Sequence, residues 1–226
     1  MAQAEYEGQR AMASLIPGNA TKPIGWGFFQ GDRSKSWFLA PFRNLKAETP
    51  DLVQFLPIVK EMHQGSQSPT GKFGFHVVPF YGPPPMKVGW TESWEYFWTR
   101  EFRSGLEYAQ SMRGARPDLV EVSDEFIAKV VPRLLRPLQT GGRSIKPSLC
   151  HGDLWDGNIQ IDEDTDEPII FDPCPFYGHN EMDLQCMRSE RYKVGINFVH
   201  LYREMLGASE PEEDFDDRNA LYAMYV

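Results

Sequence analysis

The stretch that decides how the chain folds and works reads Leu149-Cys-His-Gly-Asp-Leu-Trp-Asp-Gly-Asn-Ile-Gln-Ile161 and, after an acidic turn, Pro168-Ile-Ile-Phe-Asp172. Asp153 and Asn158 are five positions apart, and Asp172 ends an apolar run fourteen positions later. A phosphotransfer loop needs a carboxylate beside the acceptor hydroxyl, and an amide oxygen and a second carboxylate that hold magnesium on the phosphates. The spacing therefore predicts Asp153 as the catalytic base, and Asn158 and Asp172 as magnesium ligands.

A plainer interpretation treats His-Gly-Asp as a turn and Asn-Ile as the entry to a strand. The joined pattern H-G-D-x-x-x-x-N, followed by an apolar strand that ends in Asp, favours the catalytic interpretation. Gly152 and Gly157 would let the backbone turn tightly, and His151 is expected to brace the loop by hydrogen bonds. The sequence contains no zinc-protease helix, G-x-S-x-G elbow or G-x-x-x-x-G-K-[ST] loop.

Composition limits the classes of partner. The chain has 226 residues, 41% of them hydrophobic, which is enough for a sizeable core. Its formal net charge of −9 argues against a nucleic-acid partner, and the absence of a long apolar run argues against a membrane. The polar N-terminus is unlike a signal peptide, and three scattered cysteines do not form a disulfide framework. We therefore expect a cytoplasmic protein.

Hydrophobic spacing and turn residues predict a chain that alternates between helices and short strands. Asp153 and Asn158 would lie on a loop before a hairpin, and Asp172 at the exit of that hairpin. Helices are expected at about 3–15, 52–63, from 91 or 93 to 112, and at 118–138, 181–206 and 217–226. Strands are expected at 23–29 and 37–42 with a turn at 31–34, at 148–150, and at 159–161 and 169–171.

Several aromatic residues and histidines could either pack or bind. Trp94 and Trp98 are four apart on a predicted helix, a spacing that favours the core. Trp155 lies inside the catalytic loop and is a candidate substrate or nucleotide contact. His179 is expected mainly to make structural hydrogen bonds, and it is also retained as a candidate substrate contact.

Taken together, the motifs resemble the fructosamine-3-kinase (ketosamine-3-kinase) family over about residues 4–226. Aminoglycoside phosphotransferases and choline kinases are similar in fold and share the H-G-D-x-x-x-x-N loop, but they lack the Phe-Gly-Phe-His and Phe-Tyr-Gly-His stretches. The resemblance rests on His151–Asn158, Phe171–His179, Gly71–His76, Trp90–Glu95 and Pro132–Pro137.

The resemblance implies an α+β, protein-kinase-like fold with ATP between two lobes. Residues 1–45 would be an incomplete N-terminal lobe, a helix plus two strands, with the hinge. Residues 46–226 would be a mainly helical catalytic lobe that contains the catalytic-loop hairpin. The family uses ATP and Mg²⁺ to phosphorylate the 3-hydroxyl of ketosamines (fructosamines or ribulosamines). The phosphorylated adduct then decomposes and frees the amine, so glycated proteins or small ketosamines are the expected substrates.

The resemblance also assigns roles to further residues, beside the base and the two metal ligands named above. Asp183 matches the residue that braces the catalytic loop. Glu5 is similar to the helix glutamate that pairs with the nucleotide-binding lysine. Ala40 and Phe42, in the strand 38–42, would belong to the hinge that faces the adenine.

Two departures from the family pattern matter. No Gly-rich loop and no strand lysine precede Glu5, and family members continue past Tyr222 with more helix. We therefore expect a member that is truncated at both ends. Two alternatives stay open: a small-molecule kinase of the aminoglycoside or choline type, and an inactive truncated member that only binds a ligand or partner.

Overall fold

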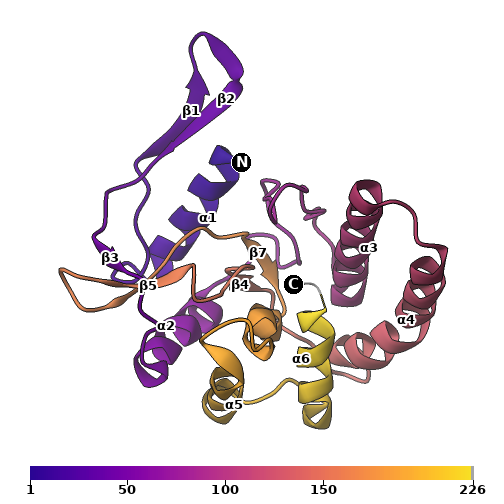
Figure 1. The fold of residues 1–226 in the computed structure, drawn as a ribbon. Helices are drawn as coiled ribbons and strands as arrows, with labels where there is room; N and C mark the ends of the chain where they lie inside the picture. The colour runs from indigo at the N-terminus through magenta and orange to yellow at the C-terminus, as the bar shows by residue number, and fades with distance from the viewer. Residues whose placement is uncertain (225–226) are drawn as a thin grey trace.

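The computed structural model describes residues 1–224, and its N-terminal part is a helix followed by a hairpin that projects from the molecule (Figure 1). Both elements were predicted from the sequence. The two strands are antiparallel, with Trp26 opposite Phe38. The elements are α1 (Ala2–Leu15), β1 (Gly25–Phe29) and β2 (Asp32–Leu39).

The second strand of this hairpin starts and ends earlier than predicted. We placed the turn at 31–34 and the strand at 37–42, whereas the turn falls at residues 30–31 and β2 ends at Leu39. A strand ends readily before Pro41, because proline has no N–H to donate to the ladder.

Two small sheets frame the loop that the sequence singled out. The predicted hairpin around the acidic turn is present, with Ile159 opposite Ile170, and the short strand before His151 pairs with a strand that follows Asp172. The catalytic loop and Asp172 therefore leave neighbouring strand ends. One sheet has the order β3 (Leu45–Lys46), β5 (Ile159–Asp162), β6 (Pro168–Ile170), and the other pairs β4 (Ser148–Cys150) with β7 (Phe176–Gly178).

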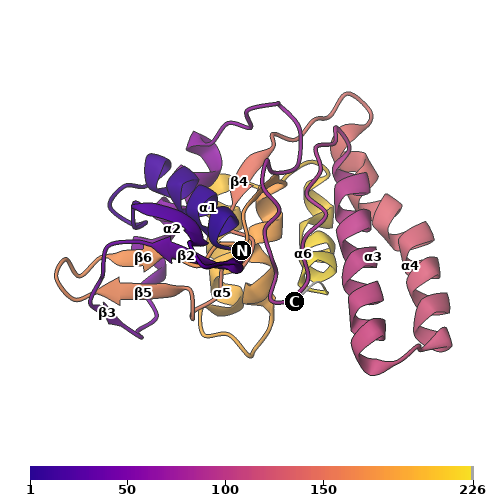
Figure 2. The ribbon, with the colours of Figure 1, turned by 90° about the horizontal axis from the view of Figure 1, so that it is seen from above.

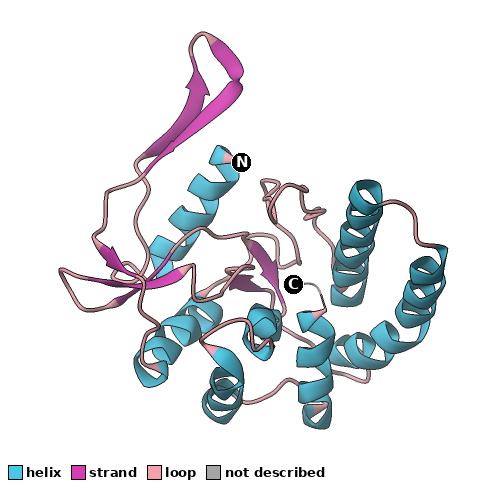
Figure 3. Ribbon diagram, in the orientation of Figure 1, coloured by secondary structure: helices cyan, strands magenta, loops and turns pink. Residues whose placement is uncertain are grey.

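Helices make up most of the remaining chain, as Figure 3 shows by colour. Helices α3 and α4 lie side by side in Figures 1 and 2 and form one flank of the molecule. Within residues 1–224, no helix has the length and apolar character needed to cross a bilayer. The helices are α2 (Leu52–Gly65), α3 (Trp94–Arg113), α4 (Pro117–Leu135), α5 (Gly195–Leu206) and α6 (Phe215–Ala223), with 3₁₀ helices η1 (Arg136–Gln139), η2 (Asn180–Arg188) and η3 (Glu212–Asp214).

The continuous helix predicted over 181–206 is wrong. Its first part is the 3₁₀ helix η2, residues 189–194 are irregular, and only the last part is the α-helix α5. Helix η2 places Glu181, Asp183 and Gln185 in the interior, where each finds a polar partner. These tertiary bonds override the helix propensity of the sequence.

Other predicted helices differ only at their ends. The helix predicted over 118–138 divides into α4 and η1 at Arg136, four residues after Pro132. The helix predicted over 217–226 begins at Phe215, and residues 225–226 lie outside the described residues. Of the two predicted caps of α3, Ser93 is the one that accepts the backbone N–H of Tyr96.

Tryptophans anchor the core, as predicted. Trp94 and Trp98 are fully buried, and the ring of Trp94 stacks on Phe97. Truncation of such a side chain to alanine costs roughly 3–5 kcal/mol. Helix α1 joins this core through Met12 and Ala13, so its C-terminal end is fixed to the larger part of the molecule.

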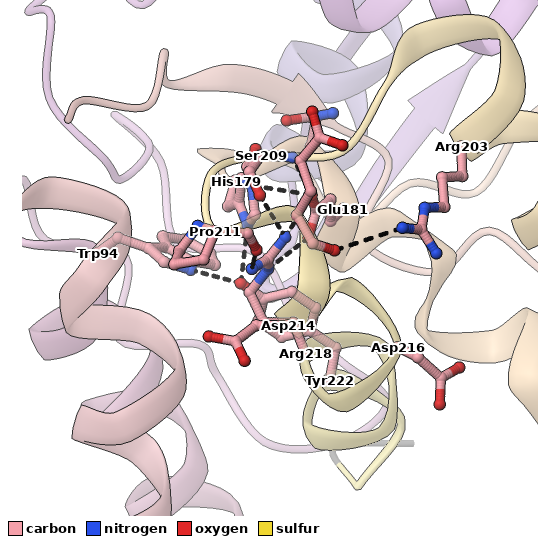
Figure 4. Close-up of polar contacts among 12 residues, drawn as sticks. Trp94, His179, Glu181, Arg203, Ser209, Pro211, Asp214, Asp216, Arg218 and Tyr222 are labelled. Carbon is pink, nitrogen blue, oxygen red and sulfur yellow. Dashed lines mark hydrogen bonds and ion pairs between the residues drawn. The ribbon is translucent and has the colours of Figure 1, made fainter.

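A buried ion pair ties helix α6 to η2 (Figure 4). The guanidinium of Arg218 donates to both carboxylate oxygens of Glu181, at 2.7 and 3.0 Å. It also donates to the carbonyl oxygens of Ser209 and Pro211, each at 2.8 Å. Because Glu181 lies two residues before Asp183, this anchor also fixes the segment that reaches the catalytic loop.

Candidate active site

The loop between β4 and β5 brings Asp153 and Asn158 into direct contact. Asn158 is 4% exposed, and its Nδ2 donates to the main-chain oxygen of Asp153 at 2.8 Å and to its Oδ2 at 3.0 Å. The same Nδ2 lies 3.5 Å from the main-chain oxygen of Asp172. With the amide nitrogen committed in this way, Oδ1 is the Asn158 atom suited to a cation.

Asp172 leaves strand β6 in an unusual backbone conformation. Its φ is 56°, in the left-handed region that non-glycine residues seldom adopt. Such local strain is typical of functional sites. The carboxylate that the sequence selected as a metal ligand is therefore carried by a bent, exposed segment next to the catalytic loop.

His151 links the two sides of the site. Its Nε2 donates to the carbonyl oxygen of Phe171 at 2.9 Å, and its Nδ1 accepts the backbone N–H of Asp153 at 3.3 Å. Burial lowers the pKa of His151, so the ring stays neutral and keeps this donor–acceptor pattern. His151 thus has the bracing position expected of it, and both of its ring nitrogens are used within the protein.

Asp183 holds the start of the loop by its backbone. Its Oδ2 accepts the N–H of His151 at 2.8 Å, and its Oδ1 accepts the N–H of Gly152 at 2.7 Å. Burial opposes ionisation of Asp183, yet hydrogen bonds from His63 and the loop hold its pKa below the usual value. The loop is therefore fixed to η2 by a buried carboxylate.

Gly152 is required at this turn. Its φ is +82°, and a Cβ there would lie 2.0 Å from the carbonyl oxygen of Cys174. Gln185, which the sequence analysis did not select, donates from Nε2 to the carbonyl oxygen of Gly152 at 2.9 Å. A glutamine in a helical segment has no local signal for such a role, because its partner lies 33 residues earlier.

Glu5 faces Asp172 rather than a lysine. Its carboxyl group hydrogen-bonds the Asp172 side chain, and burial, followed by the charge of Asp172, raises the pKa of Glu5 to about 8. Helix α1 packs closely here, since a Cβ on Gly8 would lie 2.6 Å from Cγ of Pro175. Glu5 and Gly8 are three residues apart and share this helix face.

The three carboxyl groups share one cavity of about 540 Å³. Among residues 1–224, neither lysine nor arginine lines it, so its polar wall is acidic. Burial raises the pKa of Asp153 and the charge of Asp172 adds to this, while His151 and Asn158 act in the opposite direction. A carboxylate with a raised pKa is better suited to accept a proton than an ordinary one. The cavity is lined by Met1, Ala2, Ala4, Glu5, Phe38, Pro79, Phe80, Gly82, Asp153, Asp172, Pro173 and Cys174.

The donor set fits a magnesium ion. Asp172 offers a charged oxygen and Asn158 a neutral one, and hard oxygen ligands of this kind are what Mg²⁺ prefers. Glu5 keeps its proton at neutral pH beside Asp172, and a cation bound at Asp172 would favour loss of that proton.

The predicted hinge residues border a second cavity, of about 290 Å³. Ala40 and Phe42 line it, together with Glu5 and Asp172, which also line the first cavity. The Phe42 side chain is 91% exposed. The cavity at the hinge segment and the acidic cavity are therefore neighbours that share wall residues.

The two candidate substrate contacts lie in different surroundings. The Trp155 side chain hydrogen-bonds the Asp153 carboxylate, and its ring centroid is 5.6 Å from that of Tyr192. His179 is fully buried, in keeping with the structural hydrogen bonding expected of it, and a substrate contact by this ring stays a prediction. Its Nδ1 lies 2.8 Å from the hydroxyl oxygen of Tyr222, and its Nε2 lies 2.8 Å from the hydroxyl oxygen of Ser209 (Figure 4).

The fold and the loop define a kinase-like protein, and comparison with known proteins gives the family. The chain belongs to the fructosamine kinase family, whose model matches residues 1–226. The resemblance noted from the motifs is thereby confirmed.

Similar proteins carry related names. The chain is 36% identical over 122 residues to ketosamine-3-kinase of Mus musculus. The aligned part is 54% of this chain and 37% of the mouse protein. It is 31% identical over 169 residues to the chloroplastic protein-ribulosamine 3-kinase of Oryza sativa subsp. indica. Here the aligned part is 73% of this chain and 44% of the rice protein. These alignments thus span less than half the length of either relative.

Solved structures confirm the predicted fold. A Haemophilus somnus 129PT protein, provisionally assigned as a fructosamine-3-kinase, superposes with a TM-score of 0.75 at 22% identity. The match covers 100% of this chain and 70% of that one. At this identity the likeness shows the fold alone.

Proposed function

We propose that the chain carries the catalytic centre of an ATP-dependent kinase that phosphorylates the 3-hydroxyl of ketosamines, a step in protein deglycation. The observation that carries the proposal is the convergence of Asp153, Asn158 and Asp172. Asn158 contacts both aspartates, and both aspartates line one acidic cavity. The names of the similar proteins support a ketosamine, either fructosamine or ribulosamine, as the acceptor.

The chemistry follows from these positions. Asp153 orients the 3-hydroxyl and accepts its proton as the hydroxyl oxygen bonds to the γ-phosphorus of ATP, and ADP leaves. Trp155, which hydrogen-bonds the Asp153 carboxylate, would contact the sugar. When bound, Mg²⁺ would neutralise phosphate charge, and Asn158 and Asp172 are the residues that would hold it.

The nucleotide would lie between the two parts of the chain. We propose residues 1–45 as the N-terminal lobe and hinge, and residues 46–226 as the catalytic lobe. The adenine would occupy the cavity beside Ala40 and Phe42, and the phosphates the adjoining cavity beside Glu5 and Asp172.

The expected substrates are glycated proteins or small ketosamines, and the expected setting is the cytoplasm. All three cysteines are free and buried, which suits a reducing compartment. Burial raises the pKa of Cys150 and Cys174, so these thiols are not activated nucleophiles.

An activity assay tests this proposal. The chain is incubated with Mg-ATP and a fructosamine or ribulosamine, and ADP release is followed. We expect Asp153→Asn and Asp172→Asn to abolish turnover and Asp164→Asn to leave it unchanged, because Asp164 is exposed in the turn of the same hairpin. Turnover of choline or an aminoglycoside without any ketosamine would contradict the substrate class.

An inactive family member that only binds ligand is the second candidate. It is favoured by the acidic cavity, since no lysine or arginine of the described chain lines it to hold the nucleotide phosphates. Binding of Mg-ATP or a ketosamine by calorimetry, without turnover by the same preparation, would favour this candidate over the first.

A further inference from the structure

His63 is a buried histidine that the catalytic mechanism does not use. It lies near the end of helix α2, is 1% exposed, and has both ring nitrogens bonded. Its Nε2 is 2.9 Å from Oδ2 of Asp183, the carboxylate that holds the catalytic loop. Its Nδ1 is 2.8 Å from the hydroxyl of Tyr202 on α5.

Donors and acceptors can be assigned along the hydrogen-bonded series Asn180–Tyr202–His63–Asp183. Asp183 already accepts two loop N–H groups and is ionised, so it can only accept from His63. The proton of a neutral His63 is therefore on Nε2, and Nδ1 must accept from the Tyr202 hydroxyl. The Tyr202 oxygen in turn accepts from Nδ2 of Asn180, at 2.7 Å. This agrees with the assignment, because the same hydroxyl group can accept from Asn180 while it donates to His63.

This series of hydrogen bonds connects three helical segments to the catalytic loop. Asn180 is on η2, Tyr202 on α5 and His63 on α2, and all of them act on Asp183. Among the described residues, His63 is the side-chain donor to a carboxylate whose other hydrogen bonds come from loop backbone. The orientation of the His63 ring therefore sets the orientation of the Asp183 carboxylate.

A metal centre is the competing explanation of this cluster. The ligand atoms of His63, Cys150 and Asp183 lie within 4.8 Å of one another. However, both Asp183 oxygens and both His63 nitrogens already have hydrogen-bond partners within the protein. The geometry is that of a hydrogen-bonded brace.

We propose that His63 is a positioning residue for phosphoryl transfer, whose Nε2–H donates to Asp183 and orients it and, through it, the backbone of His151 and Gly152. The reaction named here rests on the proposed function above. The positioning itself is a property of the loop and can be measured without turnover.

The chain offers a matched pair of variants. Tyr202→Phe removes the hydroxyl that orients His63. Tyr222→Phe removes an equally buried hydroxyl that bonds Nδ1 of His179, which does not contact the catalytic loop. Both variants are expected to lose similar thermal stability. Only Tyr202→Phe is expected to shift the backbone amide resonances of residues 151 and 152, and to lower kcat several-fold with KM for ATP nearly unchanged.

Replacement of His63 itself separates hydrogen bonding from packing. In His63→Gln the side-chain amide can still donate to Asp183, whereas His63→Leu fills the space without a donor. We expect His63→Leu to lower kcat about 10–100-fold, as loss of a group that orients a site residue typically does. His63→Gln should recover most of that loss.

Two readouts decide the proposal, whatever the activity of the wild-type chain. Long-range ¹H–¹⁵N spectra should show a proton on Nε2 of His63. A ring protonated on Nδ1 alone, or loop amides that respond equally to Tyr202→Phe and Tyr222→Phe, would overturn the positioning role. A wild-type chain that phosphorylates no ketosamine would overturn the proposed function, while the amide shifts would still decide the role of His63.

Discussion

Replacement of Glu5 by glutamine should make the chain more stable at alkaline pH. The pKa of Glu5 is raised from 4.5 to about 8 by burial and by the neighbouring Asp172. The folded state therefore keeps a proton that the unfolded chain loses above about pH 4.5. The resulting stability is fully present below that pH and is lost as pH rises through about 8. A glutamine at this position has no such proton to lose.

The size of the effect follows from the shift. At about 1.4 kcal/mol per pH unit, the full shift sets an upper bound of about 5 kcal/mol. Glu5 is only half-buried, and solvent screening reduces the expected difference to about 1–2 kcal/mol. Glu5→Gln should therefore match the wild type at pH 5 and exceed its free energy of unfolding by about 1–2 kcal/mol at pH 9.

Urea denaturation at pH 5, 7 and 9 without magnesium measures this difference. Glu61→Gln, the same change at an exposed position on α2, is the control and should follow the wild type throughout. The argument would be refuted by parallel pH dependences of wild type and Glu5→Gln, or by a less stable Glu5→Gln at pH 9. Mg²⁺ that binds at Asp172 should lower the pKa of Glu5 and so flatten the wild-type slope.

Three further predictions follow from the geometry. Arg218→Met leaves Glu181 buried without its cation and should cost about 3–5 kcal/mol in urea denaturation; a loss under 1 kcal/mol would contradict the buried pair. Gly152→Ala should destabilise the chain more than Gly142→Ala, because both glycines have φ +82° but only Gly152 would place a Cβ against backbone; equal melting temperatures would contradict this. In the pH–rate profile, kcat/KM should fall with decreasing pH at a pKa above the usual range of an aspartate, because the pKa of Asp153 is raised; a limb at or below pH 4 would remove Asp153 as the base.

Those parts of the site that lie close together in the sequence could be predicted. Asp153 and Asn158 share one loop, and the apolar strands around the acidic turn bring Asp172 back beside them. Here local pattern and tertiary structure agree, so spacing was sufficient to predict that these residues lie together.

The supporting contacts could not be found in the same way. His63 and Asp183 are 120 residues apart, and His63 and Tyr202 are 139 apart. A single histidine on a helix has the same local sequence whether it packs, braces or binds. The contact between Glu5 and Asp172 was not predicted, because it depends on how closely α1 packs on residues 173–175.

The most direct test of the central claim is the position of the transferred phosphate. A peptide with a fructosyl- or ribulosyl-lysine is incubated with the chain and Mg-ATP, and the product is analysed by ³¹P–¹H correlation NMR. We predict phosphate on the sugar O3 with wild type and Asp164→Asn, and none with Asp153→Asn. Phosphate on another acceptor atom, or phosphorylation that persists in Asp153→Asn, would contradict the assignment of Asp153 as the base of a ketosamine 3-kinase.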